Sequence, residues 1–473
     1  MNLLALLGTL LLLSSVWIGT VEAKSSVGDR VLVLVPKLES AKHYSRFLDS
    51  LKTRGFDLSL SAASNTSVSL QIDGERLFDH AILLAPAAKK MGGGLTPQDF
   101  VRFVNDGGNL LVAVSSELSD FHRKLGKQFG IDFEPRGSWA IDHSEFAEQN
   151  NQTDHRLIAA TNLAKVPAVL SPEILTGGSG TNASLPVFYK GIAHRYQAKN
   201  PLLIPLLVGS TTTYSGKTEV DKDGNIRSAA VDDMPLSGKS VGLVSVFQTR
   251  NNARVAFSGS TALFSDPLFK RTESGNAPFV ESISKWVFQE KSVLRESNHR
   301  HYLLSTGEQP DHYLITNDMV YEIDLSVYNN DKWHPYKADD VQFEAIMLDP
   351  YIRVTLNRTQ TSDSSATAAT YHGHIRLPDR YGTFTFRVNY KRTGYSNVDV
   401  QDTVAIWPLR HDGYPRFLTA AYPYYTGSLV MVLGFLALSA VWLWNAEPAA
   451  LKESKDMQKP RDDEKKKTKS KSK

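Results

Sequence analysis

The chain has 473 residues, 41% hydrophobic and 22% charged, which leaves room for two or three domains and excludes global disorder, collagen and a many-span transporter. It has no cysteine, which excludes disulfide bonds, a thiolate nucleophile and cysteine-held metal centres. Residues 452–473 hold ten Lys or Arg against five Asp or Glu, so the net charge of +3 comes from this tail. The positive and negative charges of the main body balance, and its net charge gives no indication of nucleic-acid binding.

The first 23 residues have the pattern of a secretory signal peptide. Leucines dominate residues 3–13, and Val21 and Ala23 stand at the spacing that signal peptidase accepts. An uncleaved membrane anchor is the alternative, but two serines at residues 14–15 interrupt the apolar run. We therefore predict a signal peptide at residues 1–23.

Residues 24–150 alternate between aliphatic runs and segments of helical periodicity. The runs are typical of strands buried on both faces of a parallel sheet, and they are residues 31–35, 58–60, 81–85 and 110–114. Helices are predicted near residues 44–51, 97–104 and 118–125, the second of them opened by Thr96 and Pro97. This alternation predicts an α/β open sheet of the Rossmann-like or flavodoxin-like kind.

Open sheets of this kind bind ligands beyond the carboxyl ends of their strands, so we expect any chemistry in the loops after Val35, Ala85 and Val114. The first loop lacks the Gly-x-Gly-x-x-Gly pattern, and we predict no dinucleotide cofactor. Residues 89–94 in the second loop read Lys-Lys-Met-Gly-Gly-Gly and could hold an anion, although a plain surface loop is the favoured interpretation.

Residues 151–305 are predicted to be a mixed α/β middle region. Strands at residues 241–247 and 255–257, joined by a turn at Asn251-Asn252, and a helix near residues 279–287 predict a second compact unit there.

The hydrophobic period changes to two between residues 306 and 415. Apolar and polar residues alternate over residues 321–327 and again over residues 384–390. Strands of this kind have one buried and one solvated face, and we predict a β-sandwich domain before the membrane.

Residues 424–444 are predicted to be a transmembrane helix. The stretch from Gly427 to Trp444 has no charge and as a helix would rise about 27 Å, with aromatic residues at both ends. A buried helix of a soluble protein is the alternative, but nothing globular follows it.

The basic tail, residues 445–473, is predicted to be cytosolic by the positive-inside bias. We therefore predict a single-pass type I membrane protein with its bulk in the lumen. Lys469 and Lys471 stand five and three places from the end and are candidates for a dilysine-like retrieval signal, which would place the protein in the endoplasmic-reticulum membrane.

Four Asn-x-Ser/Thr sequons are candidates for N-glycosylation, and Asn65 and Asn151 are favoured because their surroundings are polar. The four acceptors are Asn65, Asn151, Asn182 and Asn357.

No catalytic, cofactor-binding or metal-binding residue is predicted. His372 and His374 would share one strand face, and His299 and His301 are spaced alike, but neither pair has an obvious carboxylate at ligand spacing. Exposed strand histidines are the favoured interpretation.

Motifs for nucleophile and phosphate sites are incomplete. Residues 177–181 end in threonine where a nucleophile elbow needs glycine, and Gly238-Lys239-Ser240 lacks the first glycine of a phosphate-binding loop. The pairs Asp232-Asp233 and Asp339-Asp340 leave a glycosidase open, because its two acids need only lie close in space.

Eight segments, in order along the chain, are more specific together than any single motif. They are Gly28–Leu34, Ile82–Pro86 with Gly92–Gly94, Ala140–His143, Asn252–Val255 with Phe257–Ser260, Lys337–Gln342, Leu348–Arg353, Tyr390–Arg392 with Gly394–Tyr395, and Ala421–Tyr425. As a set they resemble the family of 48 kDa subunits of the endoplasmic-reticulum oligosaccharyltransferase. In one respect the chain departs from that pattern: Ser470 separates lysines that are often adjacent in relatives.

In that family the complex transfers a preassembled glycan from dolichyl diphosphate to Asn in Asn-x-Ser/Thr of nascent proteins, and a different subunit holds the catalytic metal. The resemblance therefore implies a non-catalytic, assembly-supporting subunit without a cofactor. Its implied partners are the multi-span catalytic subunit, ribophorin-type and small membrane subunits, and the membrane, but no nucleic acid. A stand-alone lumenal glycan-processing enzyme and a glycan-binding receptor remain alternatives.

Overall fold

The computed structural model describes residues 25–149, 152–172, 174, 185–220, 226–230, 236–271, 274–329, 331–359, 367–414, 419–445 and 452–459. It has a mixed α/β fold that separates into two compact units, residues 1–407 and residues 408–473. Several sequence predictions lie outside the described residues: the signal peptide at 1–23, Asn151, Asn182, the Asp232-Asp233 pair, Lys469 and Lys471.

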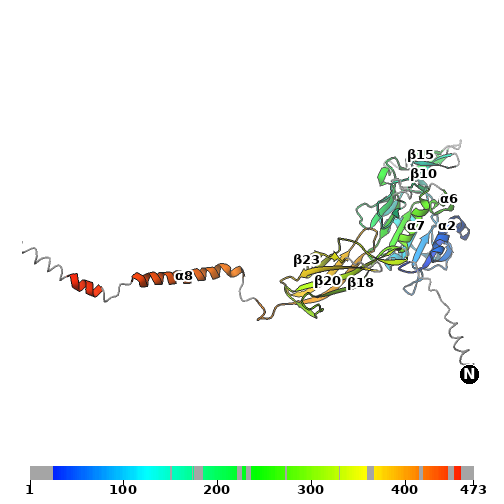
Figure 1. Ribbon diagram of the computed structural model, residues 1–473. Coiled ribbons are helices and arrows are strands. Elements are labelled where there is room, and N and C mark those ends of the chain that lie inside the picture. The colour runs from blue at the N-terminus through cyan, green and yellow to red at the C-terminus, as the bar shows by residue number, and fades with distance from the viewer. Residues whose placement is uncertain are drawn as a thin grey trace, which may run out of the picture. The chain divides into compact units, whose positions relative to one another are not determined.

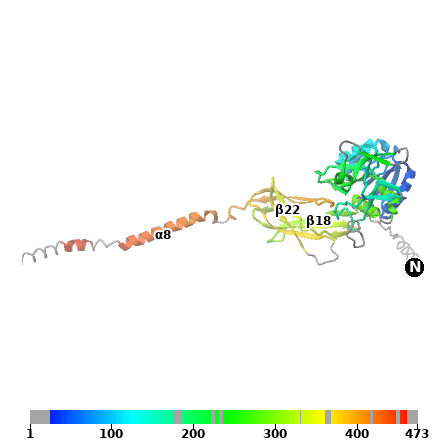
Figure 2. The same cartoon turned by 90° about the horizontal axis from the view of Figure 1, so that it is seen from above.

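One nine-stranded mixed sheet organises the amino-terminal part of the first unit, drawn in blue, cyan and green in Figure 1 and seen from above in Figure 2. Its order is β2 (Asp57–Ala62), β1 (Arg30–Val35), β5 (His80–Leu83), β6 (Asn109–Ala113), β17 (Arg254–Ser258), β16 (Gly242–Gln248), β12 (His194–Tyr196) and β7 (Ile131–Phe133), with β13 (Leu203–Val208) beside β16. The first five strands are parallel and the rest antiparallel. The aliphatic strands β1, β5 and β6 are buried on both faces, as their unbroken apolar runs predict.

The second compact unit predicted around residues 241–287 is not observed. β17 pairs in parallel with β6, with Ala256 opposite Leu111, so β16 and β17 extend the first sheet. The turn at Asn251-Asn252 does join the two strands, and Asn252 adopts a φ of 70° there. Sequence periodicity identified these strands but could not show that β17 pairs with β6, because 140 residues lie between the two strands.

Helices cover both faces of the sheet. α2 (Ser45–Thr53) and α7 (Asn276–Val287) pack on one face, while α3 (Pro97–Asn105) and α4 (Asp120–Gln128) pack on the other. The Asp99 carboxylate accepts hydrogen bonds from the backbone N–H and the hydroxyl of Thr96, and Pro97 is the first residue of α3, as the sequence predicts.

Smaller elements surround the sheet. They are three-stranded sheets of β9 (Phe146–Gln149), β10 (Gln152–Ala160) and β11 (Val187–Tyr189) and of β8 (Ser138–Ile141), β14 (Tyr214–Val220) and β15 (Ile226–Ala230), the hairpin of β3 (Gln71–Ile72) and β4 (Glu75–Arg76), the short helix α6 (Asp266–Phe269), and 3-10 turns η1 (Leu38–Tyr44), η2 (Gly92–Gly94), η3 (Gly238–Ser240) and η4 (Ala262–Phe264).

Two five-stranded sheets follow, drawn in yellow-green to orange in Figure 1. One holds β18 (Lys291–Leu303), β20 (Asp318–Asn329), β25 (Ala369–Arg376), β24 (Asn357–Arg358) and β21 (Lys332–Pro335); the other holds β19 (His312–Leu314), β27 (Val398–Trp407), β26 (Gly382–Tyr390), β22 (Gln342–Ile346) and β23 (Pro350–Thr355). Aromatic side chains join the sheets, since the rings of Tyr321 and Phe343 lie 4.7 Å apart. The predicted alternation is confirmed over residues 384–390, because Phe384, Phe386 and Val388 are fully buried between partly exposed or exposed neighbours. Over residues 321–327 it holds except at Ser326, which is buried.

The first strand of these sheets begins earlier than the expected boundary at residue 306. β18 starts at Lys291 and pairs with β20 along most of its length. Its residues are mostly polar, because one face is solvated, and this conceals the strand from a search for apolar runs.

The second unit contains one long apolar helix, α8 (Tyr422–Asn445), preceded by η5 (Thr419–Ala421). Within Thr419–Asn445, an 18-residue stretch has a mean hydropathy of 2.0 and none of it is buried, so this helix is a candidate membrane span.

Candidate functional site

The loop after Ala85, one of the three in which chemistry is expected, is occupied by structural contacts. A Cβ atom on Gly92 would overlap the backbone oxygen of Asn65, and one on Gly93 would overlap that of Val68. Gly92 and Gly93 therefore allow two backbones to approach closely, while Lys89 and Lys90 are exposed to solvent. The surface-loop interpretation accounts for this segment.

Buried histidines serve the packing of the sheet. Burial lowers the pKa of His80 to about 4, that of His122 to about 4 and that of His194 to about 3, so all three are neutral at pH 7. His80 Nε2 lies 2.9 Å from the backbone oxygen of Gly28, and its Nδ1 lies 3.2 Å from Asn109 Nδ2.

The histidine pairs singled out in the sequence lie on β18 and β25. The expectation that these histidines are exposed is wrong for His301, which is only 5% exposed. His372 and His374 share the solvated face of β25. The structure adds a carboxylate to the other pair: Asp402 lies 3.4 Å from His299 Nε2, while His301 Nδ1 lies 2.8 Å from the Tyr313 hydroxyl. Among the described residues, no group of three or more His, Asp or Glu is arranged to hold a metal ion.

Asp142 is the most strongly stabilised carboxylate in the described part of the chain. It is fully buried, and it accepts hydrogen bonds from the backbone N–H groups of Ser144 and Glu145 at 2.8 and 3.0 Å. Hydroxyl groups of Ser210, Thr212 and Thr213 also donate to it. Burial alone would raise the pKa of Asp142, but these hydrogen bonds lower it to about 2. The carboxylate thus ties two distant loops together.

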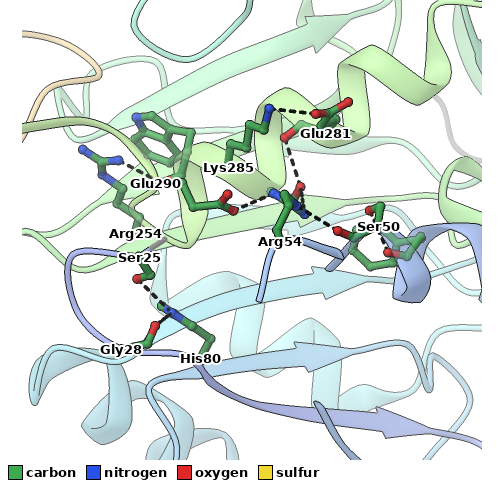
Figure 3. A network of polar contacts seen from close by, with 12 residues as sticks. Ser25, Gly28, Ser50, Arg54, His80, Arg254, Glu281, Lys285 and Glu290 are labelled. Carbon is green, nitrogen blue, oxygen red and sulfur yellow. Dashed lines mark hydrogen bonds and ion pairs between the residues drawn. The ribbon is translucent and has the colours of Figure 1, made fainter. Parts of the chain in front are cut away.

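A second buried polar network joins α2 to the end of α7 (Figure 3). The Arg54 guanidinium donates to Glu290 Oε1 at 2.5 Å and to Ser284 Oγ at 3.0 Å, and both charged side chains are less than one-tenth exposed. Lys285 and Glu281 form a further ion pair along α7 at 2.7 Å. Every group here has a structural partner, and the network holds the ends of α2 and α7 together.

Arg254 connects the α/β part to the two five-stranded sheets. Its side chain is fully buried and donates to the backbone oxygens of Trp286 and Lys291 at 2.8 Å and of Ser292 at 2.7 Å. The guanidinium carbon lies 4.8 Å from the centre of the Trp286 ring. The Arg254 guanidinium therefore binds backbone oxygens at the carboxyl end of α7 and at the start of β18, and so holds these two elements together.

The loop between β26 and β27 completes this joint. Trp286 Nε1 donates to the backbone oxygen of Gly394 at 2.7 Å, and Asn252 exchanges two hydrogen bonds with the backbone of Asn397. A Cβ atom on Gly394 would lie 2.7 Å from Cβ of Ala168. Sequence reasoning missed this joint, because the segments that it brings together lie 32 to 145 positions apart.

A cavity of about 480 Å³ opens beside the joint. Its lining includes apolar Pro201, Leu202 and Ile204 and basic Arg250, Lys391 and Arg392. Arg392 is paired with Asp340, and no carboxylate lines the cavity among the described residues. Such a lining can hold an anionic group but offers no acid and base pair for catalysis.

Two of the four candidate glycosylation sites are described. Asn65 is exposed, and its Oδ1 accepts hydrogen bonds from the backbone N–H and hydroxyl of Ser67. Asn357 is exposed on the edge strand β24.

Comparison with known proteins covers almost the whole chain. Residues 22–290 match the family model of the OST48 N-terminal domain, and residues 301–446 match that of the OST48 middle domain. The chain is 34% identical over 428 residues to the 48 kDa subunit of dolichyl-diphosphooligosaccharide–protein glycosyltransferase from Arabidopsis thaliana, covering 88% of this chain and 93% of that one. Its identity to the subunits of the same name from Caenorhabditis elegans and Danio rerio is also 34%, covering 91% and 88% of this chain and 94% and 92% of theirs.

The first family model ends at residue 290, just before β18, and the second begins at residue 301 within β18 and extends through α8. With matches of this extent and identity, the chain belongs to the OST48 family, the 48 kDa subunits of dolichyl-diphosphooligosaccharide–protein glycosyltransferase.

Proposed function

We propose that the chain is a non-catalytic, assembly-supporting subunit of the oligosaccharyltransferase complex, which transfers a preassembled glycan from dolichyl diphosphate to Asn in Asn-x-Ser/Thr of nascent proteins. The observation that carries the proposal is the family match along about 90% of the chain. The buried charged groups support the non-catalytic part, because Asp142, Arg54 with Glu290, and Arg254 are each engaged in joining elements of the fold.

The proposed topology is single-pass type I in the endoplasmic-reticulum membrane. α8 would span the bilayer, residues 24 to about 421 would face the lumen, and Lys469 and Lys471 would act in retrieval from the cytosolic tail. The uncharged 24-residue helix and the basic excess after it support this orientation. Asn65 and Asn357, both exposed, would then be accessible for glycosylation, and Asn151 and Asn182 stay candidates.

At finer detail, we infer a flavodoxin-like domain and a β-sandwich domain that meet near residue 290. The parallel order β2-β1-β5-β6-β17, with helices on both faces, supports the first. Two sheets joined through Tyr321 and Phe343 support the second.

The proposed partners are the multi-span catalytic subunit, ribophorin-type subunits and small membrane subunits. Depletion and re-expression in cells tests this role. Gly394→Val, whose side chain would meet Ala168, should lower the amount of assembled transferase seen on native gels. Glycosylation of a reporter should fall in proportion, so that transfer per assembled complex is unchanged.

The matched control is Lys89→Ala with Lys90→Ala, which changes the exposed loop at the carboxyl ends of the strands. We expect it to alter neither the amount of complex nor transfer. Loss of transfer per complex with normal assembly in this control, or sugar transfer by the purified chain alone, would show a catalytic role instead.

A further inference from the structure

Large apolar side chains gather at one end of the two five-stranded sheets. β18 ends at this point beside the start of β20, and β27 ends here at Trp407. The opposite end of the sheets carries the loop that docks on the α/β part through Trp286 and Gly394. We call the free end the tip and define it by its exposed large apolar residues: Leu304, Leu348, Tyr351, Tyr381 and Trp407.

Strand register brings these residues to the same end. Gly382 pairs with Ile406, so Tyr381 and Trp407 are adjacent at the ends of β26 and β27. Leu348 lies in the turn after β22, and Tyr351 in β23 packs on Phe384 of β26, with ring centres 5.6 Å apart.

The exposure of the tip is unusual for the first unit. Leu348 is 91% exposed, Tyr381 69% and Trp407 54%. In the described α/β part, the exposed large apolar residues are Leu38, Leu60 and Ile72, from separate segments. Isolated exposed apolar residues are common, whereas a group of them marks an interaction surface.

The chemistry of the tip fits the interfacial zone of a lipid bilayer. Tryptophan and tyrosine are enriched at the level of the lipid headgroups, because their rings are apolar and their N–H or O–H groups reach water. Trp407 is supported from behind by His312, whose ring stacks on it at 4.0 Å. Asp349, Asp379 and Arg380 are exposed beside the aromatic residues, which suits the hydrated headgroup region and opposes deeper insertion.

Chain connectivity limits the distance between the tip and α8. Residues 408–421 alone separate Trp407 from the start of α8, and fourteen residues span at most about 50 Å even when fully extended. No other part of the two sheets is joined so closely to the apolar helix.

We propose that the tip rests on the headgroup region of the bilayer and so gives the first unit a second membrane contact besides α8. This inference rests on the proposed membrane anchoring. The contact would restrict the orientations that the first unit can adopt relative to the membrane.

The absence of cysteine makes a direct test possible, because one introduced cysteine gives one labelled position. Leu348→Cys at the tip, Leu38→Cys on the α/β part and Leu436→Cys in α8 are each labelled with a fluorophore. The full-length chain is then placed in phosphatidylcholine nanodiscs that contain lipid with a nitroxide on the headgroup or in mid-chain.

The tip label should be quenched by headgroup nitroxide several-fold more than the Leu38→Cys label. Combining Trp407→Ser and Tyr381→Ser, both at exposed positions, should return the tip label to the quenching seen at Leu38→Cys. Equal quenching at the two sites overturns the proposal and would leave a protein partner as the occupant of the tip.

The Leu436→Cys label distinguishes a failure of the proposed tip contact from a failure of the proposed membrane anchoring by α8. Quenching of this label by mid-chain nitroxide shows that α8 is inserted, and a failure at the tip then counts against the tip contact alone. No quenching at Leu436→Cys would count against the membrane anchor itself.

Discussion

Two buried charged residues, Asp142 and Arg254, show how single side chains hold distant segments together. Asp142 accepts hydrogen bonds from loops that lie 68 to 71 positions away, and Arg254 donates to three backbone oxygens at the end of α7 and the start of β18. A buried charge is tolerated only when hydrogen bonds replace its hydration, so removal of either side chain leaves groups without partners.

Asp142→Asn should lower the free energy of unfolding at pH 7 by about 2 kcal/mol, because the folded carboxylate has a pKa of about 2 against an ordinary value of 3.8. The stabilisation is complete above pH 4 and is lost as the pH falls towards 2, so variant and wild type should converge in acid. Urea unfolding of residues 25–407 across this pH range measures it. Asp132→Asn, at an exposed carboxylate, is the control, and a difference that does not vary with pH would contradict the argument.

Arg254→Met should destabilise the same fragment by about 3 kcal/mol or more, since three backbone oxygens lose their donor inside the protein. Arg254→Lys keeps a charge but cannot reach all three oxygens, and we expect a smaller loss. Thermal unfolding compares them with Arg102→Met on the exposed side of α3. Similar melting temperatures for the changes at 254 and at 102 would show that the cap is unimportant.

At the scale of elements, glycines allow segments to approach closely. Gly92 and Gly93 let η2 pack on the backbone of residues 65–68, and Gly394 lets the loop before β27 enter the joint beside α7. These close approaches depend on segments that are distant in the sequence. The start of α3 instead depends on local features, the cap at Thr96 and the proline at the first helical position, which can be read from the sequence alone.

Gly92→Ala should destabilise the fold more than Gly94→Ala does. The methyl group added at Gly92 meets the backbone of Asn65, which cannot rotate away. Gly94 faces open space, so alanine there lowers the free energy of unfolding only through the unfavourable φ of 76°, by about 1 kcal/mol. Chemical unfolding of the two variants gives the order. If Gly94→Ala proved the more harmful change, backbone conformation rather than close packing would govern this loop.

At the scale of the whole molecule, a large first unit is followed by a short second unit that contains the apolar helix. The first unit has its own core, built from both faces of the nine-stranded sheet and from the aromatic contacts between the two smaller sheets. Its stability should therefore not depend on α8.

Residues 25–407 expressed alone should fold and remain in the supernatant after membranes are sedimented, while the full chain should sediment with them. A fragment that extends to Asn445 regains the helix and should return to the membrane pellet. Flotation on a density gradient checks both. A fragment 25–407 that aggregates without α8 would show that the first unit is not autonomous.

The sequence by itself determined the features that depend on neighbouring residues. The buried strands β1, β5 and β6, the ends of α3, the alternating strands β20 and β26 and the apolar helix α8 all follow from periodicity and capping within short windows. Together with the resemblance carried by eight segments, these features were enough to reach the family.

Only the tertiary structure decided what depends on pairing across the chain. It joined β16 and β17 to the first sheet, brought Asp402 to His299, enclosed Asp142 between loops and gathered the aromatic tip. Strand pairing of this kind is selected by the packing of whole sheets, and the residues that meet leave no common pattern in the sequence.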